Sequence, residues 1–289
     1  MVDTATKVRE IQKNFNIIGR SEELKKIILA RVVGKNILIE GEVGVGKTTL
    51  AQAVSNYFDS NFYRIDCSEE ILTHNLVGHW DPPLVIAKGY EEDSYVYGPL
   101  ALAMSKGGCL FINEINRMPE STQNALLTSL DEKILDIPKL KTITANNEFF
   151  VVATLNPSAH VGVTALGEAL KDRFIWIKLD YQNPEEEIEI IKKEVDVDDD
   201  IDYKIIKISQ QIVQATRDNT SIRRGSSIRG AIDLTALITQ YDNNTSTKNW
   251  IEAAIMALYN KIEMEDGVAK SKKEIITEIV LSVLNDSDF

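Results

Sequence analysis

Residues 36–49 read NILIEGEVGVGKTT and constrain the fold more than any other stretch of the chain. The apolar run NILIE is typical of a buried strand, and a helical pattern opens at Lys47. Between them, residues 41–49 match the pattern G-x-x-x-x-G-K-[ST]. The glycines let the backbone curl, so that successive N–H groups point at phosphate oxygens in front of a helix N-terminus. A plain glycine-rich turn is the alternative, but Lys-Thr after an apolar strand favours a phosphate-binding loop.

The side chains of this loop indicate a nucleotide. Lys47 would reach the β- and γ-phosphates, and the hydroxyl of Thr48 would bind Mg²⁺. The sequence therefore predicts a site for a nucleotide with its metal ion. The loop residues expected to line it are Gly41, Glu42, Val43, Gly44, Val45, Gly46, Lys47, Thr48 and Thr49.

The rest of the N-terminal part alternates short β-rich runs with helical patterns, which is typical of a parallel sheet covered by helices. This predicts an α/β fold with a five-stranded parallel sheet in a first domain of residues 1–180. The expected strands are residues 36–40, 62–66, 109–113, 149–156 and 174–179. After Pro184 only helical spacing continues, which predicts an all-helical second domain over residues 184–289.

The run CLFINEINRMP, residues 109–119, is the second candidate for chemistry. A strand that ends in an acid near a phosphate loop can orient and polarise an attacking water, which makes Glu114 the catalytic candidate. Asn113 stands where a carboxylate would hold a water of the Mg²⁺ shell. Asn accepts hydrogen bonds through its carbonyl but lacks the charge, so we expect weaker Mg²⁺ affinity and slower turnover with nucleotide binding retained.

Composition narrows the class of protein. A hydrophobic fraction of 44% over 289 residues is enough for real cores, and no apolar run reaches membrane-spanning length. Cys67 and Cys109 are isolated, so they form no disulfide framework or CxxC metal site. We expect a cytoplasmic protein without membrane insertion. The formal net charge of −12 argues against binding nucleic acid over the whole surface.

Several motifs occur in the order and spacing of one known family. GEVGVGKTTLAQAVS, FINEINRMPESTQNALLTSLDEK, FFVVATLNP, ALKDRF and GSSIRGAIDL together resemble the MoxR family of AAA+ ATPases. The resemblance covers nearly the whole chain from IIGRSEELKKIILA onward. It implies an αβα nucleotide domain followed by a small helical lid, with ATP and Mg²⁺ bound between the subunits of a ring, usually a hexamer. Asn113 departs from the family pattern, in which most members carry Asp.

The resemblance also implies roles for polar residues outside the loop. Asn156, after the apolar run 149–155, resembles the sensor-1 residue, although an ordinary strand-to-turn Asn is the alternative. Arg173 in ALKDRF resembles the arginine finger that acts on the ATP of a neighbouring subunit, and a plain surface arginine is the alternative. Arg229 in GSSIRGAIDL looks like the sensor-2 arginine, on a lid helix that Ser226 or Ser227 could cap.

Other segments carry weaker implications. Arg223 and Arg224 are close enough to be confused with Arg229. Ile18 and Gly19 in IIGR resemble the segment that packs near the adenine, although the segment alone is only a helix entry. Arg117 would face a subunit boundary or serve a structural role.

Two segments look like the insertions of this family. Residues 77–97 would form the helix-2 insert and residues 134–147 the pre-sensor hairpin, elements that engage a client in ring ATPases. For the aromatic residues of the insert, packing within it is the alternative to partner contact. The resemblance suggests a chaperone-like ATPase that remodels, activates or helps to mature a client protein complex, in a setting that commonly includes a von Willebrand A-domain protein.

Two other functions compete with this one. An ATP-gated assembly scaffold with negligible hydrolysis would explain Asn113, but it has no use for Glu114, Asn156, Arg173 and Arg229. A nucleic-acid motor on the same fold is opposed by the acidic balance and by the absence of an added DNA-binding module.

Overall fold

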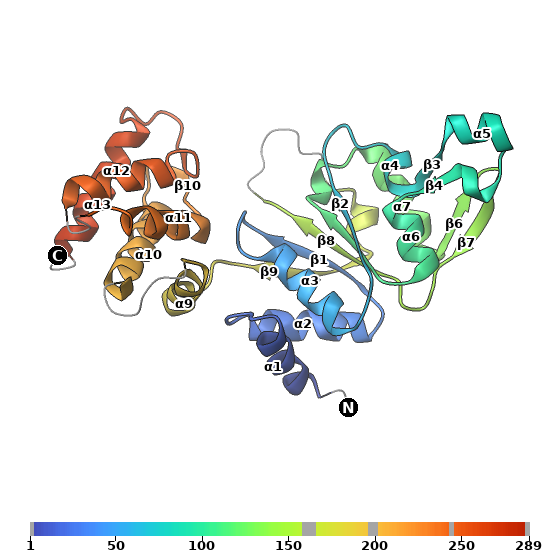
Figure 1. The fold of residues 1–289 in the computed structure, drawn as a ribbon, viewed down its shortest axis with the longest axis horizontal. Coiled ribbons are helices and arrows are strands. Elements are labelled where there is room, and N and C mark those ends of the chain that lie inside the picture. The colour runs from blue at the N-terminus through green and yellow to red at the C-terminus, as the bar shows by residue number, and fades with distance from the viewer. Residues whose placement is uncertain (1–2, 158–165, 196–201, 243–245, 287–289) are drawn as a thin grey trace. The chain divides into compact units, whose positions relative to one another are not determined.

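The computed structural model describes residues 3–157, 166–195, 202–242 and 246–286 (Figure 1). The chain forms two compact units. The first consists of Met1–Gly41 and Gly46–Asp180, and the second of Glu42–Val45 and Tyr181–Phe289. Among the described residues, no helix combines the length and the apolar character needed to cross a bilayer.

A five-stranded parallel sheet is the centre of the first unit, as predicted. Its strands are β1 (Asn36–Gly41), β2 (Phe62–Asp66), β5 (Cys109–Asn113), β8 (Phe150–Leu155) and β9 (Phe174–Leu179), in the order β2-β5-β8-β1-β9. The helices of the unit are α1 (Thr4–Asn14), α2 (Ser21–Val32), α3 (Lys47–Tyr57), α4 (Thr73–Val77), α5 (Pro82–Lys88), α6 (Pro99–Lys106), α7 (Glu120–Asp131) and α8 (Glu168–Lys171). The central strands β5 and β8 are buried on both faces, which explains their nearly continuous apolar sequences.

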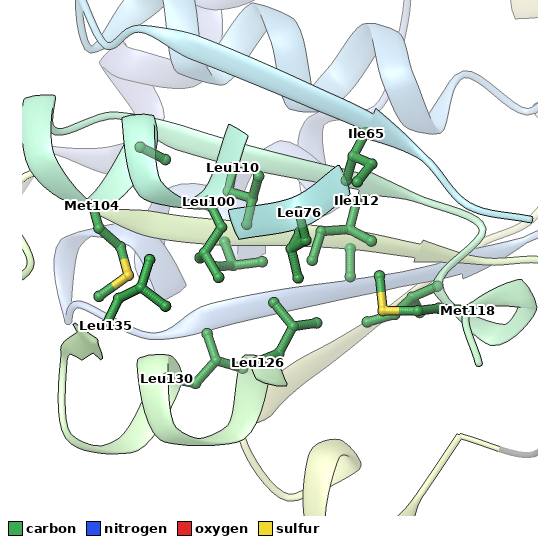
Figure 2. Packing of buried hydrophobic residues seen from close by; sticks show 14 of the residues in the cluster. Ile65, Leu76, Leu100, Met104, Leu110, Ile112, Met118, Leu126, Leu130 and Leu135 are labelled. Carbon is green, nitrogen blue, oxygen red and sulfur yellow. The ribbon is translucent and has the colours of Figure 1, made fainter. Parts of the chain in front are cut away.

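Alternate residues of the strands build two apolar layers. Leu110 and Ile112 of β5 pack in one cluster with Leu100 and Met104 of α6 and with Leu126 of α7 (Figure 2). All five side chains are fully buried, and each such burial stabilises the fold by roughly 1.5–3 kcal/mol. Residues of α6 and α7 thus bury the part of β5 that precedes Asn113, its last residue, and Glu114, which follows it.

The opposite face of the sheet is covered by α2 and α3. The ring of Phe111 stacks on that of Phe62, with ring centroids 5.4 Å apart. The guanidinium of Arg31 in α2 lies 4.4 Å from the ring centroid of Phe150 in β8. On this face, the aromatic contact joins β2 to β5, and the Arg31 contact joins α2 to β8.

Two antiparallel ribbons extend the first unit. The segment from β3 (Gly78–Trp80) to β4 (Tyr95–Tyr97) forms the first ribbon, with α5 and the 3₁₀ turn η1 (Glu92–Ser94) between its strands. The second ribbon is a hairpin of β6 (Ile134–Ile137) and β7 (Lys141–Thr144). These ribbons lie within the two segments that resemble family insertions.

The second unit is mainly helical and has its own core. Its helices are α9 (Pro184–Val195), α10 (Asp202–Asp218), α11 (Ile228–Ile238), α12 (Thr247–Leu258) and α13 (Lys272–Asp286). The fully buried Trp250 belongs to their shared apolar cluster. The helical character predicted for residues 184–289 is confirmed, but the domain is not all-helical, because β10 (Ile222–Arg224) pairs with β11 (Glu263–Met264). Strands this short are too brief to leave a period-2 pattern in the sequence.

Candidate functional site

The phosphate loop leaves β1 at Gly41 and enters α3 at Lys47. Gly44 and Gly46 have φ angles of 84° and 92°, a left-handed conformation that favours glycine. Gly46 is the N-cap residue of α3 and has no side chain to occupy the first-turn N–H groups. The ammonium of Lys47 folds back along the loop and donates to the carbonyl of Gly41 at 2.6 Å. The backbone therefore has the form of an anion cradle at a helix N-terminus.

The parallel register brings the ends of three strands to the same edge of the sheet. Glu40 near the end of β1 is paired with Leu155 at the end of β8, and Ile112 near the end of β5 is paired with Ala153. Glu114 and Asn156 are the residues that follow β5 and β8 on this edge. The edge formed by the carboxyl ends of parallel strands is where open α/β sheets bind ligands.

Hydrogen bonds define the position of the Asn113 side chain. Its Nδ2 atom donates to Oδ1 of Asp66 at 2.9 Å, and its Oδ1 atom accepts from Oγ1 of Thr154 at 2.9 Å. Asp66 lies opposite Asn113 in the pairing of β2 with β5. An acid therefore lies beside Asn113, one strand further out in the sheet.

Asp66 also has a basic partner. Arg64 donates to this carboxylate through Nε, at 2.9 Å to Oδ2, and through Nη2, at 2.6 Å to Oδ1. The guanidinium of Arg64 lowers the pKa of Asp66, and the amide of Asn113 lowers it further. Asp66 is therefore a carboxylate at neutral pH, and Asn113 faces a negative charge there.

Glu114 follows in a left-handed conformation, with φ 55° and ψ 53°. Its backbone N–H donates to Oγ1 of Thr154 at 2.9 Å, and it opens the 3₁₀ turn η2 (Ile115–Arg117). Its Oε2 atom lies 3.2 Å from Nη1 of Arg117, and 31% of the Glu114 side chain is exposed. The backbone of Glu114 is thus tied to β8, while its carboxylate remains accessible to solvent.

Asn156 is buried and contacts the turn after Glu114. The side-chain amide of Asn116, itself buried, donates to the carbonyl of Asn156 at 3.3 Å. This bond joins the segments that follow β5 and β8. Asn156 and Glu114 therefore belong to one connected edge of the sheet.

Arg173 lies elsewhere. It immediately precedes β9, whose first residue Phe174 is paired with Asn36, the first residue of β1. Arg173 therefore lies at the edge of the sheet opposite the phosphate loop. There its guanidinium donates two hydrogen bonds to the carboxylate of Asp131 at the end of α7. Nε donates to Oδ1 at 2.7 Å, and Nη2 donates to Oδ2 at 2.5 Å. The guanidinium also donates to the carbonyl of Ala169. The hydrogen bonds to Asp131 raise the pKa of Arg173.

In the second unit the three candidate arginines differ in their partners. Arg224 binds Glu263 at 2.6 Å, and Arg223 lies 3.6 Å from both Glu263 and Asp266. Arg229 is exposed in the first turn of α11, and within the described ranges its side chain has no ion pair or hydrogen bond. Ser227 is the N-cap residue of α11. The prediction that Ser226 or Ser227 caps this helix is wrong, because neither side chain bonds an N–H group of its first turn.

Ile18 and Gly19 lie just before α2 and are half-buried. Gly19 has a φ of 63°, and its carbonyl accepts a hydrogen bond from the side-chain amide of Gln12. The next residue, Arg20, donates to the carbonyl of Asp180 at 2.8 Å. The segment is therefore fixed between α1 and the end of the first unit.

The aromatic side chains of residues 77–97 pack on one another. Trp80 makes edge contacts with Tyr90 and Tyr95, at centroid distances of 5.0 and 5.1 Å, and Tyr95 does so with Tyr97. Lys139 of the β6–β7 hairpin lies 4.0 Å from the ring centroid of Tyr90. The two ribbons thus contact each other within the first unit.

The donors of the site suit a nucleotide with its magnesium ion. Backbone N–H groups at a helix start and the ammonium of Lys47 match phosphate oxygens. The Thr48 hydroxyl and the Asn113 carbonyl are oxygen donors, which Mg²⁺ prefers. Within the described ranges, no cluster of three or more His, Cys, Asp or Glu side chains forms a metal site of another kind. The loop therefore fits the predicted cofactors.

Sequence reasoning missed Asp66, Thr154 and Asn116. Asp66 carried a usable signal, an acid at the end of a strand next to the strand of Asn113. Thr154 carried another, because it is the one polar residue inside the apolar run 149–155. Asn116 carried no signal that distinguishes it from a turn residue.

Known proteins resemble the chain over most of its length. The family of the AAA domain (dynein-related subfamily) matches residues 36–174. An uncharacterized protein of Staphylococcus aureus (strain NCTC 8325 / PS 47) is 32% identical over 241 residues, which cover 80% of this chain and 91% of that protein. A homologue from the bovine strain RF122 / ET3-1 is 31% identical over the same length.

Solved structures share the fold. A proposed ATPase of Cytophaga hutchinsonii (ATCC 33406) aligns with a TM-score of 0.52 and 23% identity, covering 96% of this chain and 94% of its own. A point mutant of RuvB from Thermotoga maritima aligns with a TM-score of 0.52 and 20% identity, covering 93% of this chain and 71% of its own. These two structures share the fold. The family match and the Staphylococcus aureus relatives, together with the phosphate loop, show that the chain belongs to the AAA+ ATPases and carries an AAA domain of the dynein-related subfamily.

Proposed function

We propose that this protein is a MoxR-type AAA+ ATPase, which binds and hydrolyses ATP at the interfaces of a homo-oligomeric ring, most simply a hexamer. The observation that supports hydrolysis best is the position of Glu114. This carboxylate is accessible to solvent and follows β5 on the edge of the sheet from which the phosphate loop also leaves. A protein that only bound ATP would have no need of an acid there.

Residues of the phosphate loop would bind the nucleotide. The N–H groups of residues 42–49 would hold phosphate oxygens, and Lys47 would exchange its bond with Gly41 for the β- and γ-phosphates. Thr48 and Asn113 would hold Mg²⁺, directly or through its water shell. The ion would neutralise charge on the phosphates. Ile18 and Gly19 would supply apolar surface and backbone contacts near the adenine.

Glu114 and Asn156 would act on the attacking water. Glu114 would orient the water and accept its proton, for which one carboxylate oxygen must be turned away from Arg117. Asn156 would hold the water or the γ-phosphate from the adjacent strand end. Arg229, which is exposed in the second unit, would contact phosphate and couple the bound nucleotide to the position of the lid.

Arg173 would act on the ATP of a neighbouring subunit. Its place at the opposite edge of the sheet from the phosphate loop supports a role in trans, because it cannot serve the site of its own chain. To act there, it would have to leave Asp131. An ATPase that needs an arginine from another copy is active only when assembled.

A chaperone-like role on a client protein complex is proposed because of the MoxR resemblance. The joined ribbons of residues 78–97 and 134–144 would engage the client, with Ile86, which is 87% exposed, among the contact residues. A von Willebrand A-domain protein is the partner of first choice. The test is co-purification of wild type and a ribbon variant, Ile86→Asp, with such a partner and with ATP present. Loss of capture in the variant alone would support this surface.

The competing function is an ATP-gated scaffold with negligible turnover. Asn113 and the pairing of Glu114 with Arg117 favour it. Steady-state ATP turnover of wild type decides between the two, because a scaffold would bind ATP and turn it over no faster than Glu114→Gln. Stimulation by DNA across several salt concentrations would instead support a nucleic-acid motor.

We expect the substitution Asn113→Asp to lower the stability of the first unit slightly. The new carboxylate would face Oδ1 of Asp66 at the place where Asn113 donates a hydrogen bond. Because Asp66 is more than half exposed, solvent screens the repulsion, and the free energy of unfolding should fall by only about 0.5–1 kcal/mol. Because the variant restores the negative charge near the metal, its turnover should need less Mg²⁺ than that of wild type.

The double variant Asp66→Asn with Asn113→Asp exchanges the amide and the carboxylate. It restores a donor–acceptor pair between positions 66 and 113 but removes the carboxylate that binds Arg64, so it should recover only part of the lost stability. Turnover should need less Mg²⁺ than in wild type. Chemical denaturation and Mg²⁺ titration of turnover measure both effects. A single Asn113→Asp variant that alone lowers the Mg²⁺ requirement without loss of stability would contradict this account.

A further inference from the structure

We infer that Thr154 is a positioning residue, which fixes Glu114 for hydrolysis through a hydrogen-bond relay that includes Asn113; the inference rests on the proposed ATPase function. The relay runs along the carboxyl ends of β2, β5 and β8. Its bonds are Arg64 to Asp66 at 2.6 Å, Asn113 to Asp66 at 2.9 Å, Thr154 to Asn113 at 2.9 Å and the N–H of Glu114 to Thr154 at 2.9 Å. No other described residue bonds the backbone of Glu114 to β8.

The hydroxyl of Thr154 provides a hydrogen bond between β5 and β8 just beyond the last paired residues of the two strands. The paired residues end at Ile112 and Ala153, so the N–H of Glu114 has no strand carbonyl to bind. Thr154 accepts this N–H through its side chain instead. The chain is thereby free to turn, and Glu114 adopts the left-handed conformation that costs a non-glycine residue of order 1–3 kcal/mol.

Asn113 gives the hydroxyl its direction. A threonine hydroxyl has one proton and two lone pairs, and the proton of Thr154 is directed to Oδ1 of Asn113. A lone pair then remains for the N–H of Glu114. The amide of Asn113 is itself oriented by Asp66, since only its Nδ2 side can donate to a carboxylate. A carboxylate at position 113 would still accept the proton of Thr154 but would have no proton to donate to Asp66, so only an amide makes both bonds.

The inner end of the relay, at Thr154, is buried, whereas its outer members Arg64 and Asp66 are about half exposed. Thr154 is fully buried, and both its donor and its acceptor capacity are used inside the fold. Loss of the hydroxyl would leave the N–H of Glu114 without its partner and release the turn. A displacement of about 1 Å at a reacting group can lower turnover by roughly 100-fold, so the relay is expected to affect the chemical step and not nucleotide binding.

The test compares Thr154→Val, which has the same shape without hydrogen-bonding capacity, with Thr154→Ser, which keeps the hydroxyl. Turnover number, KM for ATP and affinity for a fluorescent ATP analogue are measured for each. We expect Thr154→Val to lower the turnover number by about 10- to 100-fold with nucleotide affinity within about twofold, and Thr154→Ser to stay within about threefold of wild type.

A matched control separates positioning from general destabilisation. Thr122 is also a fully buried threonine of the first unit, and its hydroxyl donates to the carbonyl of Ile71 at 3.1 Å, outside the relay. Thr122→Val should lower the melting temperature to a similar extent and leave the turnover number unchanged. Equal losses of turnover in both valine variants would overturn the inference.

Two further variants keep the test decisive. Asp66→Ala changes a largely exposed side chain that does not threaten folding, and it removes the acceptor that orients Asn113. We expect a fall of about three- to tenfold in turnover number. Combining Thr154→Val with Glu114→Gln should cost nothing beyond Glu114→Gln alone, because Thr154 acts through Glu114.

The outcomes distinguish the inference from the proposed function. Wild-type turnover with an unaffected Thr154→Val variant overturns the inference and leaves the ATPase function in place. Wild-type turnover no faster than that of Glu114→Gln overturns the function and the inference together. Loss of turnover in Thr154→Val, rescue in Thr154→Ser and an unaffected Thr122→Val support both.

Discussion

Glu114→Gln is expected to lower ATP turnover by about 10²- to 10⁴-fold while ATP binding stays within about twofold of wild type. Gln has the shape of Glu, and its carbonyl can still accept from Nη1 of Arg117, so the turn after β5 should be preserved. What is lost is the negative charge that would accept a proton from the attacking water. The backbone bond to Thr154 does not depend on the side chain.

The measurement pairs steady-state phosphate release with binding of a fluorescent ATP analogue over a range of Mg²⁺ concentrations. Lys47→Ala is the complementary control, because it should lose ATP affinity as well as turnover. If Glu114→Gln retained wild-type turnover, the water would be activated by another group and the assignment of Glu114 would be wrong. If it lost ATP affinity to the same extent as Lys47→Ala, its role would be binding.

Arg173→Ala is expected to lower turnover by as much as about 10³-fold, with little change in ATP affinity, because a guanidinium stabilises the charge that spreads over the γ-phosphate oxygens. Removal of the side chain also breaks the ion pair with Asp131. Asp131→Ala breaks the same pair and keeps the arginine. The two variants should therefore lose thermal stability alike, and only Arg173→Ala should lose turnover.

Mixing experiments test whether Arg173 acts in trans. Glu114→Gln supplies an intact Arg173, and Arg173→Ala supplies an intact Glu114. In mixed assemblies some interfaces then contain both groups, so two inactive proteins should regain activity on mixing. Equal defects in Arg173→Ala and Asp131→Ala, without recovery on mixing, would instead mean that Arg173 is a structural arginine.

The sequence alone determined the elements whose information is local. The apolar run, the glycines and the Lys-Thr pair of residues 36–49 are neighbours in the chain, so strand, loop and helix follow from one short stretch. The five strands were likewise predicted, because strands buried on both faces carry continuous apolar runs. Glu114 could be selected since it directly follows such a strand.

Only the tertiary structure decided which side chains meet. Asn113 is 47 residues from Asp66 and 41 from Thr154 in sequence, and it meets both because β5 lies between β2 and β8 in a fixed register. The parallel pairing of β1 with β9 places Arg173 at the edge away from the phosphate loop. Local patterns determine strands and turns, whereas the strand order and register, set by burial of the two sheet faces, determine the partners of each polar group.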